Sequence, residues 1–199
     1  ELDRLGNTTI AYQASGIDGI KVRLVAKCKD AATAAELLNA EEALIRHLLG
    51  DVIFGVDEET MEVAVLSAMR RQAMTLAATE QVTGGLLAAR LSAADPELAT
   101  FRGARIAPES GSDAAGALAE RATAAAARAR EEFGTTVGVA AIAGAAREAD
   151  GPRTAPVVLA AALGDRHHSE PIILPADRGR LRDFAVISLL NMLRKALAA

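Results

Sequence analysis

The sequence predicts an α/β protein in which a small α+β unit, residues 1–72, precedes a second unit, residues 73–199. Two observations lead to this fold class. The N-terminal part alternates apolar and polar residues, as strands with one solvated face do, whereas Val137–Ala143 and Ala155–Leu163 are continuous apolar runs. Such runs are typical of central strands that are covered on both faces, so we expect helices on both sides of the second sheet.

The first unit reads as a hairpin followed by a helix, a strand and a second helix. The expected elements are strands at 8–13 and 20–28, a helix from the capping residue Asp30 to about Leu49, a strand at 51–55 and a helix capped by Asp57. The turn Gly16–Gly19 matches the GxxG of KH nucleic-acid modules, but here it joins strands and carries Asp18. We therefore interpret it as a hairpin turn.

The second unit alternates strands and helices before it ends in an apolar helix. The expected elements are a strand at 75–79, a helix from Leu86, a strand at 100–107, an alanine-rich helix capped by Ser112 or Asp113, the two apolar strands, a return strand at 170–174 and a last helix capped by Asp177. The last helix is apolar almost all round, which predicts either deep burial or packing against a second copy of the protein.

Composition argues against several functions. The net charge is −4, there is no Trp and only one Tyr, and no long basic run occurs, so we expect no nucleic-acid partner. We also expect no membrane span, because no apolar run approaches the ~20 residues required. Cys28 is alone, and the adjacent His167 and His168 would point to opposite faces of a strand, so neither a metal nor a cofactor is expected. The chain opens on Glu1 without a signal-like segment, which suggests a piece of a longer cytoplasmic protein.

The junction Glu80–Gly85, between the predicted strand and helix, is the strongest candidate site. A strand that leads through Thr83-Gly84-Gly85 into a helix leaves backbone N–H groups at the positive end of the helix dipole, where an anion such as phosphate would bind. An ordinary strand-to-helix turn fits the same spacing, with Thr83 as the helix cap.

The second unit resembles the C-terminal domain of the CinA family, the nicotinamide-nucleotide amidohydrolases, and the first unit resembles the small domain before it. The resemblance lies in Leu76–Ala88, similar to the family's L-A-T-A-E-S-C-T-G-G-L-L-A, in Phe101-Arg102-Gly103, Ile142-Ala143-Gly144 and Asp177-Arg178, and in Gly55–Thr60 of the first unit. It implies a three-layer α/β/α domain with a mixed sheet, a homodimer, a nucleotide ligand, and a further N-terminal domain in longer members. The ligand-binding residues it implies are Glu80, Gln81, Thr83, Gly84, Gly85, Ala143 and Gly144.

The family's chemistry does not carry over to this sequence. The resemblance implies hydrolysis of the nicotinamide amide by a serine assisted by a tyrosine and a lysine, but Gln81 stands at the serine position and Pro108 at the tyrosine position. The lysine is either deleted or replaced by Asp113. A carboxamide is no nucleophile, so we predict no catalytic residue and an inactive binding or assembly module. The alternative is an enzyme of altered specificity that uses Glu80 with Thr83 or Ser110.

Overall fold

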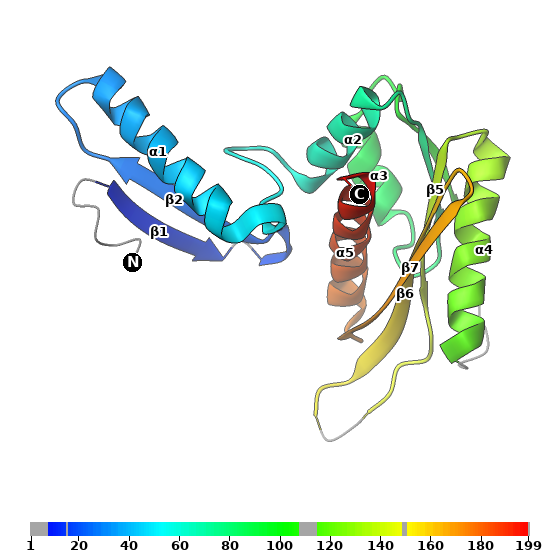
Figure 1. Ribbon diagram of the computed structural model, residues 1–199. Coiled ribbons are helices and arrows are strands. Elements are labelled where there is room, and N and C mark those ends of the chain that lie inside the picture. Colours follow the sequence, from blue (N-terminus) through cyan, green and yellow to red (C-terminus); the bar gives the residue numbers. More distant parts are fainter. Residues whose placement is uncertain (1–7, 15, 108–114, 149–150, 199) are drawn as a thin grey trace. The chain divides into compact units, whose positions relative to one another are not determined.

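The computed structural model describes residues 8–14, 16–107, 115–148 and 151–198, and its chain forms two compact units, Glu1–Glu58 and Glu59–Ala199 (Figure 1). The sequence analysis placed the boundary at residues 72 and 73 instead. The difference concerns helix α2 (Met61–Arg71), which packs against α5 (Arg178–Ala198) and α3 (Leu86–Ala94) of the second unit.

Unit 1 is an antiparallel hairpin covered by one helix. Strands β1 (Thr8–Ala14) and β2 (Ile20–Ala26) pair in register, and α1 (Ala31–Leu49) packs on them. Asp30 caps α1 by accepting a 2.8 Å hydrogen bond from the Thr33 N–H, and Gly50 ends it, so both predicted ends are confirmed. The Thr33 N–H bond also lowers the pKa of the Asp30 carboxyl.

Two expectations for the segment after α1 were wrong. Residues 51–55 form no strand: a short 3-10 helix, Gly50–Val52, is followed by an irregular stretch. The apolar residues of this segment have no strand to pair with, because the described sheet of unit 1 contains only β1 and β2. Asp57 does not cap the next helix, since its φ of 53° places it in a turn, and Thr60 caps α2 through the Val63 N–H.

Unit 2 is built on a mixed five-stranded sheet in the order β4-β3-β5-β6-β7. The strands are β3 (Leu76–Glu80), β4 (Phe101–Ile106), β5 (Val137–Ala143), β6 (Thr154–Leu163) and β7 (Arg166–Pro175). β3 pairs in parallel with β4 and β5, while β6 and β7 run antiparallel. The carboxyl ends of β3, β4 and β5 therefore meet at one edge of the sheet, which is where the candidate site lies.

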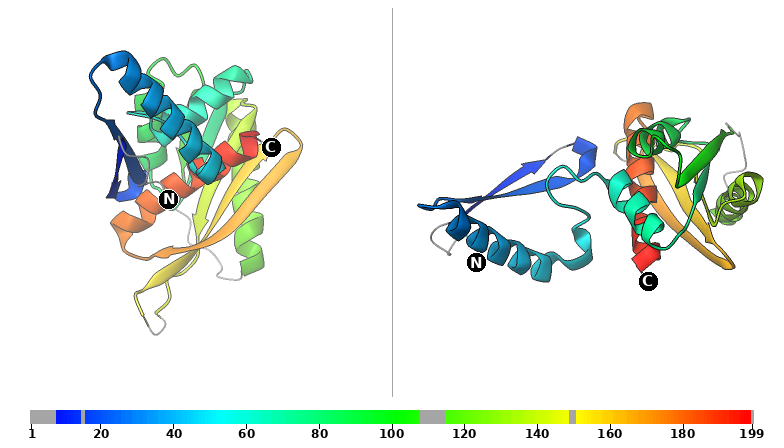
Figure 2. Two further views of the ribbon diagram at one scale, coloured as in Figure 1. Left: turned by 60° about the vertical axis from the view of Figure 1, so that its left-hand side comes forward. Right: turned by 90° about the horizontal axis from the view of Figure 1, so that it is seen from above.

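Helices cover both faces of this sheet, which confirms the predicted three-layer arrangement (Figure 2). The alanine-rich α4 (Ala115–Phe133) lies against β5 and β6 on one face, with Ala122, Ala126 and Ala129 fully buried. Small side chains permit this close approach: a Cβ on Gly138 of β5 would lie within 2.7 Å of the Arg130 amide nitrogen.

The other face of the sheet carries α2, α3 and α5. The last helix, α5, buries Ala185, Val186, Leu189, Leu190, Met192 and Leu193, so its apolar surface is largely used within the chain. The Asp177 carboxylate caps it by accepting the Arg180 N–H at 3.0 Å, as predicted. Within the described residues, no helix has the length and apolarity that a membrane span requires.

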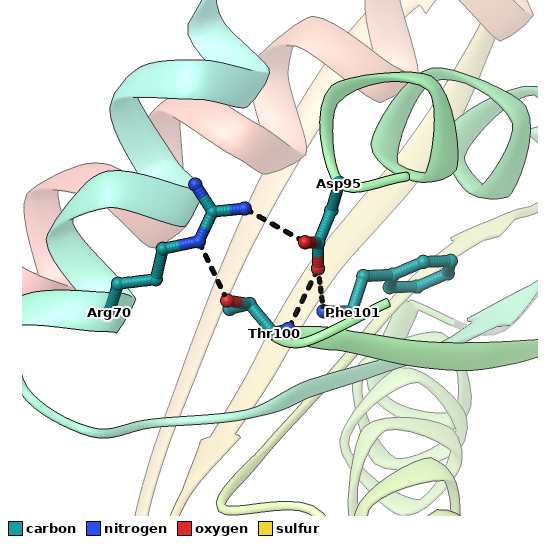
Figure 3. A network of polar contacts seen from close by, with 4 residues as sticks. All are labelled: Arg70, Asp95, Thr100 and Phe101. Atoms are coloured by element: carbon teal, nitrogen blue, oxygen red, sulfur yellow. Dashed lines mark hydrogen bonds and ion pairs between the residues drawn. The ribbon is translucent and has the colours of Figure 1, made fainter. Parts of the chain in front are cut away.

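A polar network in which Asp95 and Thr100 are buried and Arg70 is exposed ties α2 to the segment between α3 and β4 (Figure 3). Arg70 Nη2 contacts Asp95 Oδ1 at 2.8 Å, and Arg70 Nε donates to the Thr100 hydroxyl at 3.1 Å. The second Asp95 oxygen, Oδ2, accepts the N–H groups of Thr100 and Phe101, both at 2.7 Å. Burial alone would raise the pKa of Asp95, but these hydrogen bonds and the guanidinium charge together lower it.

Candidate functional site

Glu80, the last residue of β3, is fully buried and occupies the predicted anion position with its own carboxylate. Its Oε2 accepts the N–H of Gly85 at 2.7 Å and of Leu87 at 3.2 Å, and its Oε1 accepts the N–H of Ala88 at 2.9 Å. These are the donors at the start of α3 that we expected a ligand phosphate to use. The expected cradle is therefore filled by the protein itself, and an added anion there would meet a like charge.

Two glycines carry the chain from Glu80 into α3. Gly84 has φ 55° and Gly85 has φ 95°, backbone conformations that favour glycine, and Gly85 is the N-terminal cap of the helix. Arg182 of α5 fixes this turn from outside, because its Nε donates to the Thr83 carbonyl at 2.8 Å and its Nη2 to the Gly84 carbonyl at 3.2 Å. Our sequence analysis missed Arg182, since nothing in the spacing links residues this far apart in the chain.

Thr83 does not cap the helix with its side chain, contrary to the expectation. The carboxylate of Glu80 takes that role, while only the backbone carbonyl of Thr83 bonds to the start of α3, at the Leu86 N–H. The Thr83 hydroxyl is buried and has no hydrogen-bond partner within the described part of the chain. Glu80 and Thr83 thus do not form the acid–hydroxyl pair that the alternative enzymatic hypothesis needs.

Gln81, at the position of the family nucleophile, links the turn to the neighbouring strand. Its Oε1 accepts the Ala143 N–H at 2.9 Å, at the end of β5. The Gly144 N–H is also used within the fold, by the Pro156 carbonyl at 2.9 Å. The structure therefore brings Gln81 and Ala143 together through a bond that holds β3 and β5 in place.

Four residues for which the sequence analysis proposed a role lie outside the described residues: Pro108, Ser110, Ser112 and Asp113. The loop after Gly144 is described up to Glu148 and again from Gly151, and Arg147 and Thr154 form an antiparallel bridge across it. His167 and His168 are exposed on the edge strand β7. The described residues include no group of three or more His, Cys, Asp or Glu that could hold a metal ion.

A cavity of about 580 Å³ lies at the opposite edge of the sheet, away from the Glu80 turn. Several of its polar groups already bond within the protein: Arg130 Nη1 donates to the Gly164 carbonyl, the Gln72 amide to the Leu197 carbonyl, and the Thr136 hydroxyl to the Thr75 carbonyl. The cavity also lies where α4 and α5 end, and the negative end of a helix dipole disfavours anions. We do not assign a ligand to it.

Comparison with known proteins gives a consistent result over both units. Residues 1–55 match the family model described as the damage-inducible protein CinA KH domain. A CinA-like protein of Frankia casuarinae is 35% identical and covers 99% of this chain, and one of Myxococcus xanthus is 32% identical and covers 89%. The chain spans about half the length of these relatives, 48% and 46% respectively.

Solved structures share the fold of the second unit. A competence-damaged protein (CinA) superfamily protein from Klebsiella pneumoniae aligns with a TM-score of 0.58 and 20% identity, covering 69% of this chain and 96% of that one. The competence/damage inducible protein CihA from Agrobacterium tumefaciens gives 0.56 and 18%, covering 74% and 99%. At these identities the likeness concerns the fold.

Proposed function

Because the chain belongs to the CinA family, we propose that it is a CinA-like module that has lost amidohydrolase chemistry and retains a nucleotide-binding or assembly role. The observation on which this proposal rests is that Gln81 occupies the position of the family's nucleophile. Gln81 offers no nucleophile, and its carboxamide oxygen is engaged by the Ala143 N–H. The only carboxylate beside it in sequence, Glu80, accepts three backbone N–H groups and is not free to act as a base.

The proposal extends to a nucleotide ligand, a homodimer and a cytoplasmic location. Since Glu80 fills the start of α3 and the N–H groups of Ala143 and Gly144 are bonded within the fold, a nucleotide would have to use other phosphate donors at this edge of the sheet. The solitary Cys28 suits a reducing compartment.

The direct test is ammonia release from nicotinamide mononucleotide by the purified chain. We expect no release above a catalyst-free control, for the wild type and for Gln81→Ser alike, because a serine without a neighbouring base is a poor nucleophile. Release by the wild type well above the control would overturn the proposal. Gln81→Ala should lower the free energy of unfolding by about 1 kcal/mol, the usual contribution of one hydrogen bond.

Nucleotide binding is tested separately by thermal shift with nicotinamide mononucleotide and nicotinate mononucleotide. A ligand at about 100 times its Kd adds roughly 2.7 kcal/mol of apparent stability, which is readily detected. Nicotinamide riboside, which lacks the phosphate, is the matched control ligand. Stabilisation by the nucleotides without turnover supports a binding module, whereas no stabilisation by any of them leaves assembly as the proposed role.

One observation supports a second candidate, an enzyme of altered specificity. The Thr83 hydroxyl is buried and unpartnered within the described residues, as a hydroxyl awaiting a substrate could be. Thr83→Val removes that hydroxyl at constant shape. This candidate requires that some hydrolytic activity of the wild type on a nucleotide or amide disappears in the variant, and it is rejected if the activities of the two proteins are the same.

A further inference from the structure

The register of β6 assigns Arg153 to one particular face of the unit 2 sheet. Alternate residues of β6 pack with α4 in one apolar cluster: Val158, Ala160 and Ala162. The residues between them therefore face the other side of the sheet, which α2, α3 and α5 cover. The Arg153 carbonyl accepts the Ala176 N–H at 2.9 Å, next to the pair Thr154–Pro175, so the β6–β7 ladder continues to Arg153. Arg153 thus belongs to the row that faces α5.

The helical phase of α5 assigns Arg178 to the same side. Arg182 donates to the carbonyls of Thr83 and Gly84, so its face of α5 is directed towards the Glu80 turn. Arg178 is four residues before Arg182, about one helical turn, and lies on the same face of the helix. Figure 1 shows β7 leading directly into α5, and the connecting residue Ala176 is the one that bonds to Arg153. The backbone therefore brings Arg153 and Arg178 together at the edge of the sheet that carries the Glu80 turn.

Both arginines are available to an external anion. They are exposed, and neither has an ion pair within the described residues. The described acidic residues of the loop and of the α5 cap, Glu148 and Asp177, form no ion pair with them, and the Asp177 carboxylate already accepts the Arg180 N–H. Two like charges on one face repel each other, and a bound anion relieves that repulsion.

We propose that Arg153 and Arg178 bind the phosphate group of the nucleotide ligand. This inference rests on the nucleotide binding proposed above, and it names the donors that the Glu80 turn does not supply, because Glu80 occupies the start of α3. A guanidinium presents its N–H groups in a planar fork that binds phosphate through two hydrogen bonds, so two guanidiniums on one face hold a phosphate monoester. Ligands of open α/β sheets bind outside the carboxyl ends of the strands, and β3, β4 and β5 end at this edge.

The small number of cations on this face favours a single phosphate group over a nucleic acid. Binding of a phosphodiester backbone draws on many contacts spread along an extended basic surface. Arg153 and Arg178 instead come from two segments that one backbone hydrogen bond joins, so they provide a local site. Since Arg182 links this face of α5 to the Glu80 turn, the remainder of the nucleotide lies towards Gln81.

Two further arginines at the same edge provide a matched control. Arg147 pairs with Thr154, which belongs to the row that faces α4, on the other side of the sheet. Arg180 is two residues after Arg178, about 200° around the helix. Both are exposed, and neither has an ion pair within the described part of the chain. Replacing Arg147 and Arg180 changes the charge of this edge as much as replacing Arg153 and Arg178 does, but leaves the proposed phosphate site intact.

Isothermal titration calorimetry of the full chain with nicotinamide mononucleotide, nicotinamide riboside and inorganic phosphate tests the proposal. We expect the mononucleotide and phosphate to bind and the riboside to bind more weakly than the mononucleotide. The double variant Arg153→Gln/Arg178→Gln should lose roughly tenfold or more in affinity for both phosphate-containing probes, because the bidentate donors are removed. Arg147→Gln/Arg180→Gln should stay within about threefold of the wild type, since only the general field of the edge changes. Circular dichroism and thermal unfolding without ligand check that both variants fold.

The outcomes separate this inference from the proposed function. If the mononucleotide binds the wild type and Arg153→Gln/Arg178→Gln equally well, the phosphate site is rejected while nucleotide binding stands. If only inorganic phosphate binds, and the same variant abolishes its binding, the phosphate site stands while the nucleotide ligand is rejected. Equal losses in both double variants, or no binding of either phosphate-containing probe by the wild type, overturn the inference. Binding of poly-glutamate without binding of phosphate also overturns it and indicates an acidic protein partner instead.

Discussion

The two units bury their carboxylates in different ways. In unit 2, Glu80 accepts three backbone N–H groups, and Asp95 accepts two together with the guanidinium of Arg70. In unit 1, Glu41 is only 4% exposed, yet its Oε2 receives a single long hydrogen bond of 3.5 Å from the Thr8 hydroxyl and its Oε1 has no partner within the described residues. A buried carboxylate costs little free energy where its oxygens accept hydrogen bonds that hold a turn, and it destabilises the fold where its oxygens have few partners.

The two units also differ in how completely they bury their apolar side chains. Unit 2 places a sheet between two layers of helices, so fully buried alanines and leucines fill its interior. Unit 1 has one helix on a two-stranded sheet, and Ile45 is its only apolar residue in the buried class within the described residues, while Tyr12 and Ile20 remain 67% and 71% exposed. We infer that unit 2 depends on close packing and that unit 1 depends less on any single residue.

The largest effect should come from closing the gap between α4 and the sheet. Gly138→Ala would place a Cβ against the backbone of Ala126 and Arg130 in α4. Because the backbone of a packed helix cannot move aside, we expect a loss of about 3 kcal/mol in the free energy of unfolding. Urea denaturation measures it. Gly151→Ala is the matched control, because a Cβ there meets nothing within 4 Å, and its stability should equal that of the wild type. Equal stability of both variants would contradict the close packing of unit 2.

A smaller effect should distinguish the two buried glutamates. Glu80→Gln replaces one acceptor oxygen by an NH₂ group facing backbone N–H groups, and we expect it to destabilise unit 2 by about 2 kcal/mol. Glu41→Gln removes a charge with few partners and should be neutral or stabilising. Hydrogen exchange of peptides from β3 and from α1 reports the units separately. Similar losses in both variants would show that the two carboxylates are equally well satisfied.

Patterns that depend on neighbouring residues were predictable from the sequence. The hairpin, α1 with both of its ends, and the two apolar strands β5 and β6 follow from periodicity and from the helix cap Asp30, and the mixed sheet followed from the family resemblance. The segment 51–55 was not predictable, since an apolar run becomes a strand only where another strand is available to pair with it.

The turn from Glu80 to Gly85 was predictable as local structure, but the acceptor of its N–H groups was not. The spacing from Glu80 to Gly85 correctly indicated a turn rich in N–H donors at the start of α3. Which acceptor binds those donors depends on the direction of the Glu80 side chain, and the support from Arg182 depends on the folding of α5 against the turn. Both are tertiary features, which spacing along the chain does not encode.

The smallest effect we predict is a pH dependence of stability that is larger in unit 2 than in unit 1. The pKa of Asp95 is lowered from its ordinary value of 3.8. Its ionised form therefore stabilises the fold above the unfolded pKa, and this contribution is lost as the pH falls through the folded pKa. Asp95→Asn should cost about 1.5 kcal/mol at neutral pH and should flatten the acid limb of the stability curve.

Asp30→Asn is the control for this measurement, because the pKa of Asp30 is also lowered but its carboxylate caps α1 at an exposed position. Solvent screens an exposed charge, and Asn is itself a good helix cap, so this variant should flatten the acid limb much less than Asp95→Asn does. Hydrogen exchange of β4 peptides, followed from neutral to acidic pH, reads the Asp95 network directly, because Phe101 N–H is one of its donors. If Asp30→Asn flattened the acid limb as much as Asp95→Asn, the pH dependence would come from exposed caps, and the contrast between the two units would not extend to their carboxylates.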